Sequence, residues 1–304
     1  MQHTFNLPLF SVEQTSLETI NWGMICEGVR DLWNLTKGSN VKVAILDTGI
    51  AQRHHDLASA ILQTKDTTNS RHGSDDVLGH GTHCAGIIAA RNNGFGVLGV
   101  APECKLLICK VISDNNSCNE QSVINGLNWA ISQEADIISM SVGTKTSTEK
   151  LHNAIITASQ KAYIVCAAGN NGKSLDAINY PARYIETISV GAIDHNRRIP
   201  VYSSQGDRVD IVAPGDQIIS CWPPNGMAML SGTSMACPFV VGIIALLVSY
   251  RKRNNKIKLT KEEILDILSK SAVDLGQTGK DVESGFGLID PIALLRESEE
   301  HYSK

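Results

Sequence analysis

Three short segments place a carboxylate, an imidazole and a hydroxyl where each could take part in nucleophilic catalysis. Asp47 directly follows the apolar run 41–46, at the end of an expected strand. His80 is flanked by two glycines and begins a stretch of small residues. Ser234 stands in the sequence Gly-Thr-Ser-Met-Ala (232–236), where a helix is expected to begin. An orienting carboxylate, a general base and a hydroxyl are the groups that an activated serine nucleophile needs.

Each residue alone also has a structural explanation. A carboxylate after a strand often forms or caps a turn, and a serine at a helix start often serves as the N-cap. The start of a helix also favours a developing oxyanion, because its free N–H groups and its dipole carry positive charge. The combination in the order Asp47, His80, Ser234 favours catalysis over these separate explanations.

Metal binding at His80 is an alternative. His80, His83 and Cys84 have the i, i+3, i+4 spacing that brings side chains to one face of a helix. A further ligand could come from the neighbouring segment His54, His55 and Asp56. A structural role for His83, donating to a nearby acceptor, is the simpler expectation.

Short apolar runs alternate with longer helical patterns along the chain. Strands are predicted at 41–46, 106–111, 135–142, 163–168, 187–192 and 209–212, helices at 80–90, 120–133, 148–162 and 235–250, a hairpin around 223–226, and a capping box that opens a helix at 260–263. This alternation predicts an α/β fold, doubly wound, with a mostly parallel sheet and helices on both faces. We expect one catalytic domain over residues 20–304, preceded by an extension over residues 1–19.

Composition limits the classes of function. The 304 residues are 42% hydrophobic and 19% charged with a net charge of −4, which predicts a packed core and gives nucleic-acid binding no electrostatic support. No apolar stretch is expected to reach the roughly 18 residues of a membrane span, and the longest candidate is 239–250. The N-terminus lacks a basic segment followed by an apolar run, so we expect a cytoplasmic protein whose eight cysteines are free thiols.

The three segments closely resemble the signatures of the subtilisin-like (S8) serine protease family, and in character the intracellular subtilisins. The matching sequences are Asp-Thr-Gly at 47–49, His-Gly-Thr-His at 80–83 and Gly-Thr-Ser-Met-Ala at 232–236, and the resemblance covers roughly residues 20–295. A fourth segment, Ala-Ala-Gly-Asn at 167–170, resembles the family segment whose Asn side chain faces the oxyanion. The resemblance implies a serine endopeptidase that acts through an acyl-enzyme, with Asn170 donating beside the backbone N–H of Ser234.

The resemblance also implies a substrate groove. Its residues would be Ser141, Val142 and Gly143 on one wall, Ala167, Ala168 and Gly169 on the other, Asn179 near the pocket base, and Ser117 on a second substrate-edge strand. Two positions depart from the family, which usually has glycines at 116–118 and often an aromatic residue at 120, where this chain has Glu120. These departures suggest a narrower or more polar preference beyond P1, and no acidic residue supports a strict Arg/Lys preference at P1.

Residues 90–97 resemble the calcium-binding loop of the family. The implied ligands are the Asn93 side chain, the carbonyls of Arg91, Phe95 and Val97, and the carboxylates of Asp56 and Glu18. A set of oxygen ligands suits calcium, which is a hard ion. The alternative is a turn held by its own hydrogen bonds. No organic cofactor is expected.

The N-terminal sequence Leu7-Pro8-Leu9-Phe10 resembles the short inhibitory propeptide of intracellular subtilisins. A proline fixes φ, so it lowers the entropic cost of a bent pose across an active site. An ordinary disordered terminus is the alternative.

Two other functions remain open from the sequence. One is a peptide-tailoring protease or transpeptidase that passes the acyl group to an amine. The other is a catalytically silent binding module on the same fold. For the endopeptidase and for the transpeptidase, the expected partner is a peptide or protein substrate. Neither nucleic acid nor a membrane is expected as a partner. The sequence does not indicate an oligomeric state.

Overall fold

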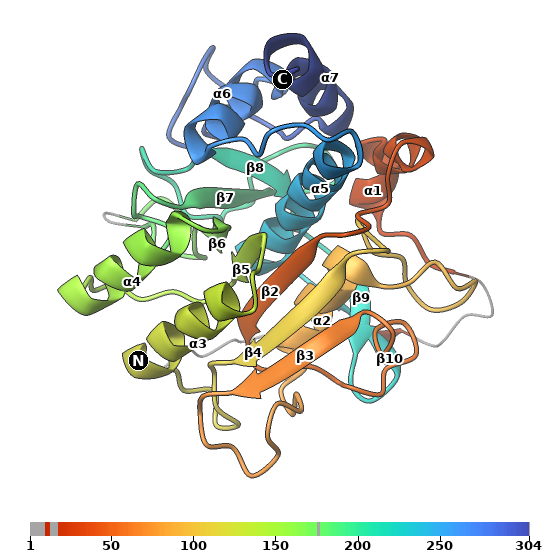
Figure 1. The fold of residues 1–304 in the computed structure, drawn as a ribbon. Helices are drawn as coiled ribbons and strands as arrows, with labels where there is room; N and C mark the ends of the chain where they lie inside the picture. Colours follow the sequence, from red (N-terminus) through yellow and green to blue (C-terminus); the bar gives the residue numbers. More distant parts are fainter. Residues whose placement is uncertain (1–9, 13–17, 175–176, 304) are drawn as a thin grey trace.

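A computed structural model describes residues 10–12, 18–174 and 177–303 of the chain. Its centre is a seven-stranded sheet with the order β3-β4-β2-β5-β6-β7-β8, in which every neighbouring pair is parallel (Figure 1). The strands are β2 (Lys42–Asp47), β3 (Ile61–Asp66), β4 (Lys105–Lys110), β5 (Ile137–Met140), β6 (Tyr163–Ala167), β7 (Ile188–Ile193) and β8 (Ile211–Pro214). The predicted doubly wound α/β fold is confirmed.

Helices cover both faces of this sheet, which explains why its inner strands are largely apolar runs. Helices α3 (Glu120–Ser132) and α4 (Glu149–Ser159) pack against each other over one face. Helices α2 (His80–Ala89) and α5 (Thr233–Arg253) pack against each other over the opposite face. Side-chain caps begin α3 and α4, since Asn119 accepts from Ser122 N–H and Thr148 accepts from Leu151 N–H.

The strand order reverses direction at β2. The chain continues from β2 to β3 and β4 on one side, and β5 to β8 then build outward on the other side. In open parallel sheets, ligands bind beyond the carboxyl ends of strands at such a switch point. Asp47 is the last residue of β2 and therefore lies at this point.

A second, antiparallel sheet has the order β1-β10-β9. The predicted hairpin is present as β9 (Ile218–Trp222) and β10 (Gly226–Leu230). Strand β1 (Phe10–Val12) pairs with β10 through its backbone. The rest of the proposed propeptide motif, residues 7–9, lies outside the described residues.

Helix α5 spans Thr233–Arg253 and is therefore longer at both ends than the predicted range 235–250, which already included Pro238. Its length and apolar composition meet the criteria for a membrane span, so the expectation that no segment would do so was wrong. However, 94% of its most apolar window is buried inside the protein. α5 is therefore the central core helix of this face.

Several elements were not predicted from the sequence. They are α1 (Trp22–Cys26), a 3₁₀ helix (Val29–Asn34), β3 and α7 (Pro291–His301). The capping box at Thr260 and Glu263 opens α6 (Lys261–Ser271) as predicted.

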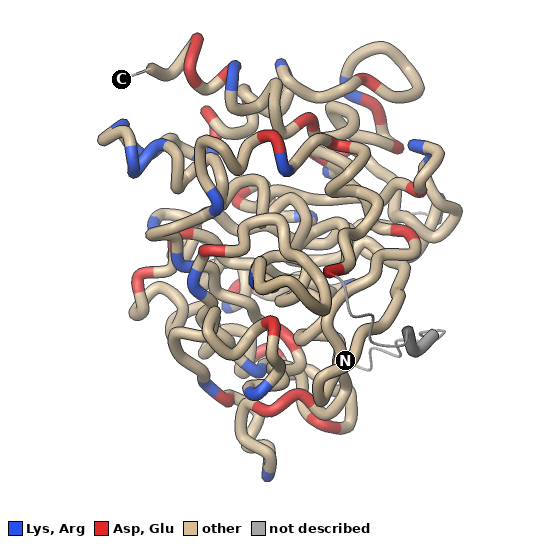
Figure 2. Tube along the Cα trace, turned by 90° about the vertical axis from the view of Figure 1, so that its right-hand side faces the viewer, with Lys and Arg blue, Asp and Glu red and all other residues tan. Residues whose placement is uncertain are grey.

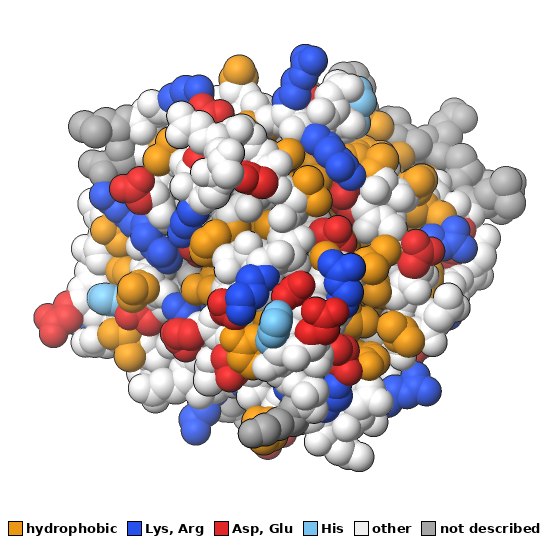
Figure 3. Space-filling model, turned by 90° about the horizontal axis from the view of Figure 1, so that it is seen from above, with side chains coloured by type: hydrophobic (Ala, Val, Ile, Leu, Met, Phe, Trp, Pro, Cys, Tyr) orange, Lys and Arg blue, Asp and Glu red, His pale blue; other side chains and the backbone are white. Residues whose placement is uncertain are grey.

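All eight cysteines are free thiols, seven buried and Cys26 exposed. Segments of both charge signs are scattered over the backbone trace (Figure 2), and the face seen in Figure 3 mixes both signs with apolar side chains.

Candidate active site

Asp47 is held at the end of β2 by backbone bonds on one side and by a side-chain bond on the other. Its carbonyl accepts from the N–H groups of Val111 and Ile112, at 2.8 and 3.1 Å. Its carboxylate oxygen Oδ1 accepts from Thr48 N–H at 2.7 Å. The side chain is 1% exposed, so this carboxylate acts in a low-dielectric environment.

His80 is the first residue of α2, and Gly81 explains how this helix comes so close to the Asp47 loop. A Cβ on Gly81 would lie 2.3 Å from Gly49 O and 3.2 Å from the Asp47 Cβ, closer than side-chain atoms can approach. The Gly81 N–H instead donates to Thr48 Oγ1 at 2.8 Å. Glycine at 81 is thus required for the helix start to touch the loop.

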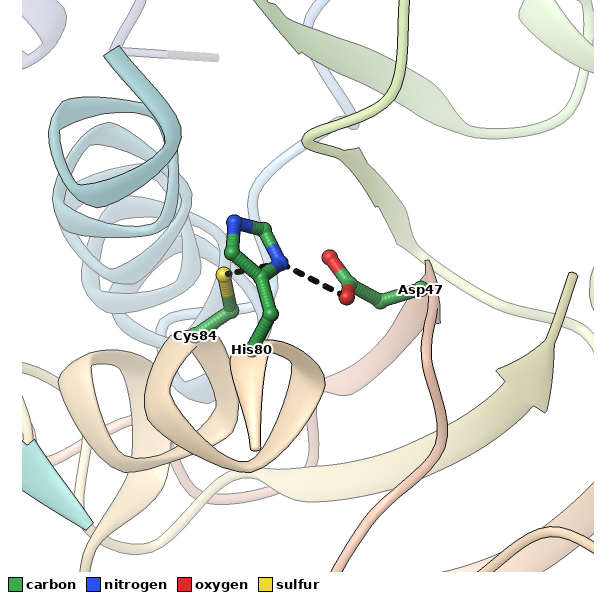
Figure 4. A group of neighbouring side chains, drawn as sticks. All are labelled: Asp47, His80 and Cys84. Atoms are coloured by element: carbon green, nitrogen blue, oxygen red, sulfur yellow. Dashed lines mark hydrogen bonds and ion pairs between the residues drawn. The ribbon is translucent and has the colours of Figure 1, made fainter. Parts of the chain in front are cut away.

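The imidazole and the carboxylate meet directly. His80 Nδ1–H donates to Asp47 Oδ1 at 2.7 Å, and both side chains are at most 2% exposed (Figure 4). This bond leaves Nε2 as the basic nitrogen of a neutral ring. Burial opposes protonation of the ring, but the Asp47 carboxylate outweighs burial, so the pKa of His80 lies well above its usual range.

Ser234 is the second residue of α5 and is 6% exposed. Cys84 lies between Ser234 and His80, because its Sγ is 3.4 Å from the Ser234 carbonyl oxygen and 3.9 Å from His80 Nδ1. The Ser141 hydroxyl also donates to the Ser234 carbonyl at 3.2 Å. The packing of α2 on α5 therefore brings the Ser234 backbone close to the Asp47–His80 pair.

Asn170 lies on the exposed loop after β6 and faces the start of α5. Its Oδ1 accepts from Thr233 N–H at 3.0 Å and from Thr233 Oγ1–H at 3.1 Å. These bonds orient the amide and commit its oxygen, leaving Nδ2 as the donor. A Cβ placed on Gly232 would be 3.2 Å from Asn170 Nδ2 and 3.7 Å from Ser234 N. The two nitrogen atoms thus lie near one another, and an oxyanion site needs two such donors close together.

A cavity of about 200 Å³ adjoins Ser234. Its lining includes Ser141, Val142, Gly143, Ala167, Gly169, Asn170, Asn179 and Ser234, so most of the predicted groove residues come together there. Ala168 is fully buried and does not line this cavity. The cavity lining contains no acidic side chain among the described residues.

Ser117 is also outside this cavity and belongs to a tight turn. Ser113 N–H donates to the Ser117 carbonyl at 2.8 Å, and Ile112 bridges Cys118 across the turn. Asn116 takes a φ of 59°, the left-handed conformation that glycine adopts more easily and that asparagine tolerates. Asparagine thus replaces glycine in this turn. Glu120 begins α3 next to a small apolar pocket and accepts a hydrogen bond from Thr148 Oγ1.

The residues of the predicted calcium loop converge on one another. Asp56 Oδ1 accepts from Asn93 Nδ2 at 3.0 Å, and Asp56 Oδ2 accepts from Val97 N–H at 3.0 Å. Glu18 Oε1 accepts from Asn93 N–H at 3.1 Å. Two carboxylates from distant segments therefore contact the loop 91–97 through hydrogen bonds, and the loop itself contains the Asn93 side chain. This donor set fits a hard cation such as calcium.

The alternative metal site at His80, His83 and Cys84 is not assembled. His83 Nε2–H donates to the carbonyls of Ile218 and Ala228, both at 3.1 Å, and so lies against β9 and β10. Burial lowers the pKa of His83 to about 3, which keeps it neutral. The structural role expected for His83 is the one that these bonds describe.

Two buried charged residues near Asp47 and His80 were missed. Asp76 precedes His80 by four residues and is 5% exposed, and Lys110 ends β4 with a fully buried side chain. The sequence carried one signal for Lys110, since a single lysine interrupts the apolar run 106–112. Asp76 follows a second aspartate in a polar segment, and nothing in the local pattern distinguishes the two.

Comparisons with known proteins show the family of the chain. The family model of the subtilase family matches residues 38–287. The chain is 41% identical over 266 residues to an intracellular serine protease of Paenibacillus polymyxa, covering 85% of this chain and 81% of that protein. It is 38% identical over 276 residues to the major intracellular serine protease of Bacillus subtilis, with 88% and 86% covered. It is 37% identical over 269 residues to thermitase of Thermoactinomyces vulgaris, with 88% and 93% covered. The chain belongs to the subtilase family and is a subtilisin-like serine protease.

Proposed function

We propose that this protein is an endopeptidase that hydrolyses peptide bonds through Asp47, His80 and Ser234 and a covalent acyl-enzyme. The observation that carries the proposal is the 2.7 Å hydrogen bond from His80 Nδ1 to Asp47 Oδ1. Cys84, which contacts the His80 ring, also contacts the Ser234 backbone. A buried carboxylate bonded to Nδ1 fixes the tautomer in which Nε2 is the base.

In this mechanism His80 Nε2 takes the proton of Ser234 as Oγ bonds to the scissile carbonyl carbon. The tetrahedral oxyanion accepts from Asn170 Nδ2–H and from Ser234 N–H. The C–N bond then breaks, and His80 delivers the proton to the leaving amine. Water attacks the acyl-enzyme by the same route, regenerates the Ser234 hydroxyl and releases the new carboxyl terminus.

The test is labelling by a fluorophosphonate combined with peptide turnover. The wild-type chain should gain the mass of one phosphonyl group on Ser234 and lose all activity, and Ser234→Ala should gain none. For Ser234→Ala we expect about a 10⁶-fold loss in kcat, the magnitude measured in a subtilisin. Turnover by Ser234→Ala close to the wild-type rate would refute the proposed triad.

The cavity beside Ser234 supports a preference for uncharged P1 side chains. It has about 200 Å³, and the lining residues carry no acidic group that would pair with Lys or Arg. A positional-scanning peptide library measures this preference directly, with Ser234→Ala as the blank. A dominant Lys or Arg preference at P1 would contradict this assignment.

Calcium is proposed as a structural ion at Glu18, Asp56 and Asn93 with the carbonyls of Arg91, Phe95 and Val97. What supports it is the convergence of two carboxylates on one loop. The bound ion would cross-link the N-terminal segment, the Asp56 loop and the end of α2, far from any bond that reacts.

The N-terminal extension is proposed to restrain activity, and the protein to act inside the cell. The pairing of β1 with β10 supports the first point, because it attaches part of the extension to the edge of the β1-β10-β9 sheet. The names of two relatives, both intracellular serine proteases, support the second. A chain beginning at Ser16 should turn over peptide faster than the full chain, whereas equal rates would count against inhibition.

A further inference from the structure

Asp76 is a buried carboxylate that accepts five hydrogen bonds although it touches no atom of the proposed triad. Its Oδ1 accepts from Thr48 Oγ1–H at 2.9 Å, Leu78 N–H at 3.0 Å and Gly79 N–H at 2.7 Å. Its Oδ2 accepts from Thr82 N–H at 2.8 Å and from Thr82 Oγ1–H at 2.7 Å. Burying an ion is unfavourable unless it is well bonded, and here both oxygens are satisfied.

The donors come from the two segments that carry the acid and the base. Thr48 directly follows Asp47 and donates its own N–H to the Asp47 carboxylate. Gly79 directly precedes His80, and Thr82 lies in the first turn of the same helix. The Thr48 hydroxyl also accepts from Gly81 N–H at 2.8 Å. One carboxylate therefore ties the end of β2 to the start of α2.

A buried cation supports the same loop from the other side. Lys110 pairs with Asp47 in the register of β4 and β2, and its ammonium group donates to the carbonyl of Thr48. The same ammonium lies 3.4 Å from the carbonyl of Asp75 and 3.1 Å from Asp114 Oδ1. Thr48 is thus held between an anion at its hydroxyl and a cation at its carbonyl.

We propose that Asp76 is a positioning residue for the triad, acting through Thr48 and the first turn of α2 to hold Asp47 against His80. The inference rests on the proposed function and adds a residue to it. A displacement of about 1 Å in a reacting group can lower the rate by a factor of about 100. Supporting groups that lock the reacting side chains are therefore part of the catalytic design.

A simple helix cap would explain only part of this arrangement. A cap needs the bonds from the free N–H groups at the helix start, which Asp76 receives from Leu78, Gly79 and Thr82. The bond from the Thr48 hydroxyl has no role in capping, because Thr48 lies in another segment. The positioning role is therefore tested most sharply at the pair Asp76 and Thr48.

The first variant is Asp76→Asn, which keeps the shape of the side chain. The amide NH₂ replaces one of the two carboxylate oxygens, and each of these oxygens accepts a hydrogen bond from a backbone N–H. The NH₂ group therefore faces a backbone N–H that cannot reorient, and a hydrogen bond is replaced by a repulsive contact. After titration of active sites with a fluorophosphonate, we expect kcat to fall about 10- to 100-fold. KM should stay within about threefold, because no lining residue of the substrate cavity is changed.

The pH profile of kcat/KM gives a second reading. The groups that face His80 are Asp47 from β2 and Cys84 and His83 from α2, and all three are retained in the variant. A looser contact with Asp47 should move the acid limb to lower pH. A variant that was merely less stable would keep the wild-type profile per titrated site.

Thr48 supplies the paired variants. Thr48→Val removes the hydroxyl and should lower kcat in the same way, whereas Thr48→Ser keeps the hydroxyl and should recover most of the loss. The double variant Asp76→Asn with Thr48→Val should lose less than the sum of the two single variants, because both changes break the bond between Thr48 and Asp76. If Asp76→Asn fails to fold, the Val and Ser variants at Thr48 decide the question.

Asp210→Asn is the matched control. Asp210 is another buried carboxylate, 1% exposed, which accepts from Ser189 N–H at 2.9 Å and pairs with Lys280 at 3.2 Å. It precedes β8 and so lies at the amino edge of the sheet, opposite Asp47. Asp210→Asn should lower stability and leave kcat and the pH profile unchanged.

Two results would overturn the inference. One is a wild-type kcat and pH profile in Asp76→Asn or Thr48→Val, and the other is an equal loss of kcat in Asp210→Asn. Full activity of Ser234→Ala would instead refute the proposed triad itself. The two failures are therefore distinguishable.

Discussion

Acid sensitivity of the fold is expected to depend strongly on His83. This side chain is fully buried, and its Nε2–H is committed to the carbonyls of Ile218 and Ala228. Burial lowers its pKa to about 3 from the usual value of 6.5. Between these values the unfolded chain binds a proton at this residue and the folded chain does not. Stability therefore falls as the pH falls below 6.5.

The size of the effect follows from the pKa difference. Each pH unit in this window removes about 1.4 kcal/mol from the free energy of unfolding. At pH 4.5, two units below the unfolded value, the loss assigned to His83 is about 3 kcal/mol. His80 adds no slope in this range, because the raised pKa of His80 keeps it protonated in both states below 6.5.

The assay is urea unfolding at pH 7.5 and pH 4.5 in a Ser234→Ala background, which prevents self-digestion. The matched variant is His83→Gln, whose amide can donate to the same carbonyls and does not titrate. The loss of unfolding free energy between the two pH values should be about 3 kcal/mol smaller in His83→Gln. Equal losses in both proteins, or an NMR titration of His83 near pH 6.5, would refute the reasoning.

Three further predictions concern the proposed catalytic and calcium sites. Asn170→Ala should lower kcat about 100- to 1,000-fold at similar KM, which is the loss measured for the corresponding donor in a subtilisin. An unchanged kcat on a chromogenic peptide would exclude the oxyanion role. Asp47→Asn should lower kcat about 10⁴-fold. It should also move the acid limb of the kcat/KM profile to lower pH, because the carboxylate raises the pKa of His80. An acid limb that does not move would contradict the electrostatic account. The Tm of the Ser234→Ala protein, measured by calorimetry with calcium at 100 times its Kd, should fall by about 5–10 °C when the calcium is chelated. The same protein carrying Asp56→Asn should show no such shift.

Much of the architecture was predictable because it depends on local patterns. Continuous apolar runs separated by helical periodicity indicated a parallel sheet covered on both faces, and strands such as β2 and β6 begin and end within one residue of the prediction. Short elements with weak patterns were missed. Strand β3 is an edge strand with an alternating exposed face, and its sequence Ile-Leu-Gln-Thr-Lys-Asp lacks the apolar run of the inner strands.

Helix α5 shows how local rules can mislead about length. The sequence predicted a helix over 235–250, whereas α5 begins two residues earlier and ends three residues later, although proline normally interrupts a helix interior. Pro238 lies in the second turn of α5, where it replaces few hydrogen bonds, and burial of the whole helix outweighs its cost. The same burial explains why a segment apolar enough for a membrane lies in the core.

The sequence by itself determined which side chains could supply an acid, a base, a nucleophile and an oxyanion donor, because each lies beside a local signal such as a strand end, a glycine pair or a helix start. It did not determine what surrounds them. Asp76 and Thr48 are 28 residues apart, and His83 reaches carbonyls 135 and 145 residues away. Such contacts depend on the register of the strands and on helix packing, which no local pattern contains. Only the tertiary structure therefore decided which buried charges support the proposed active site.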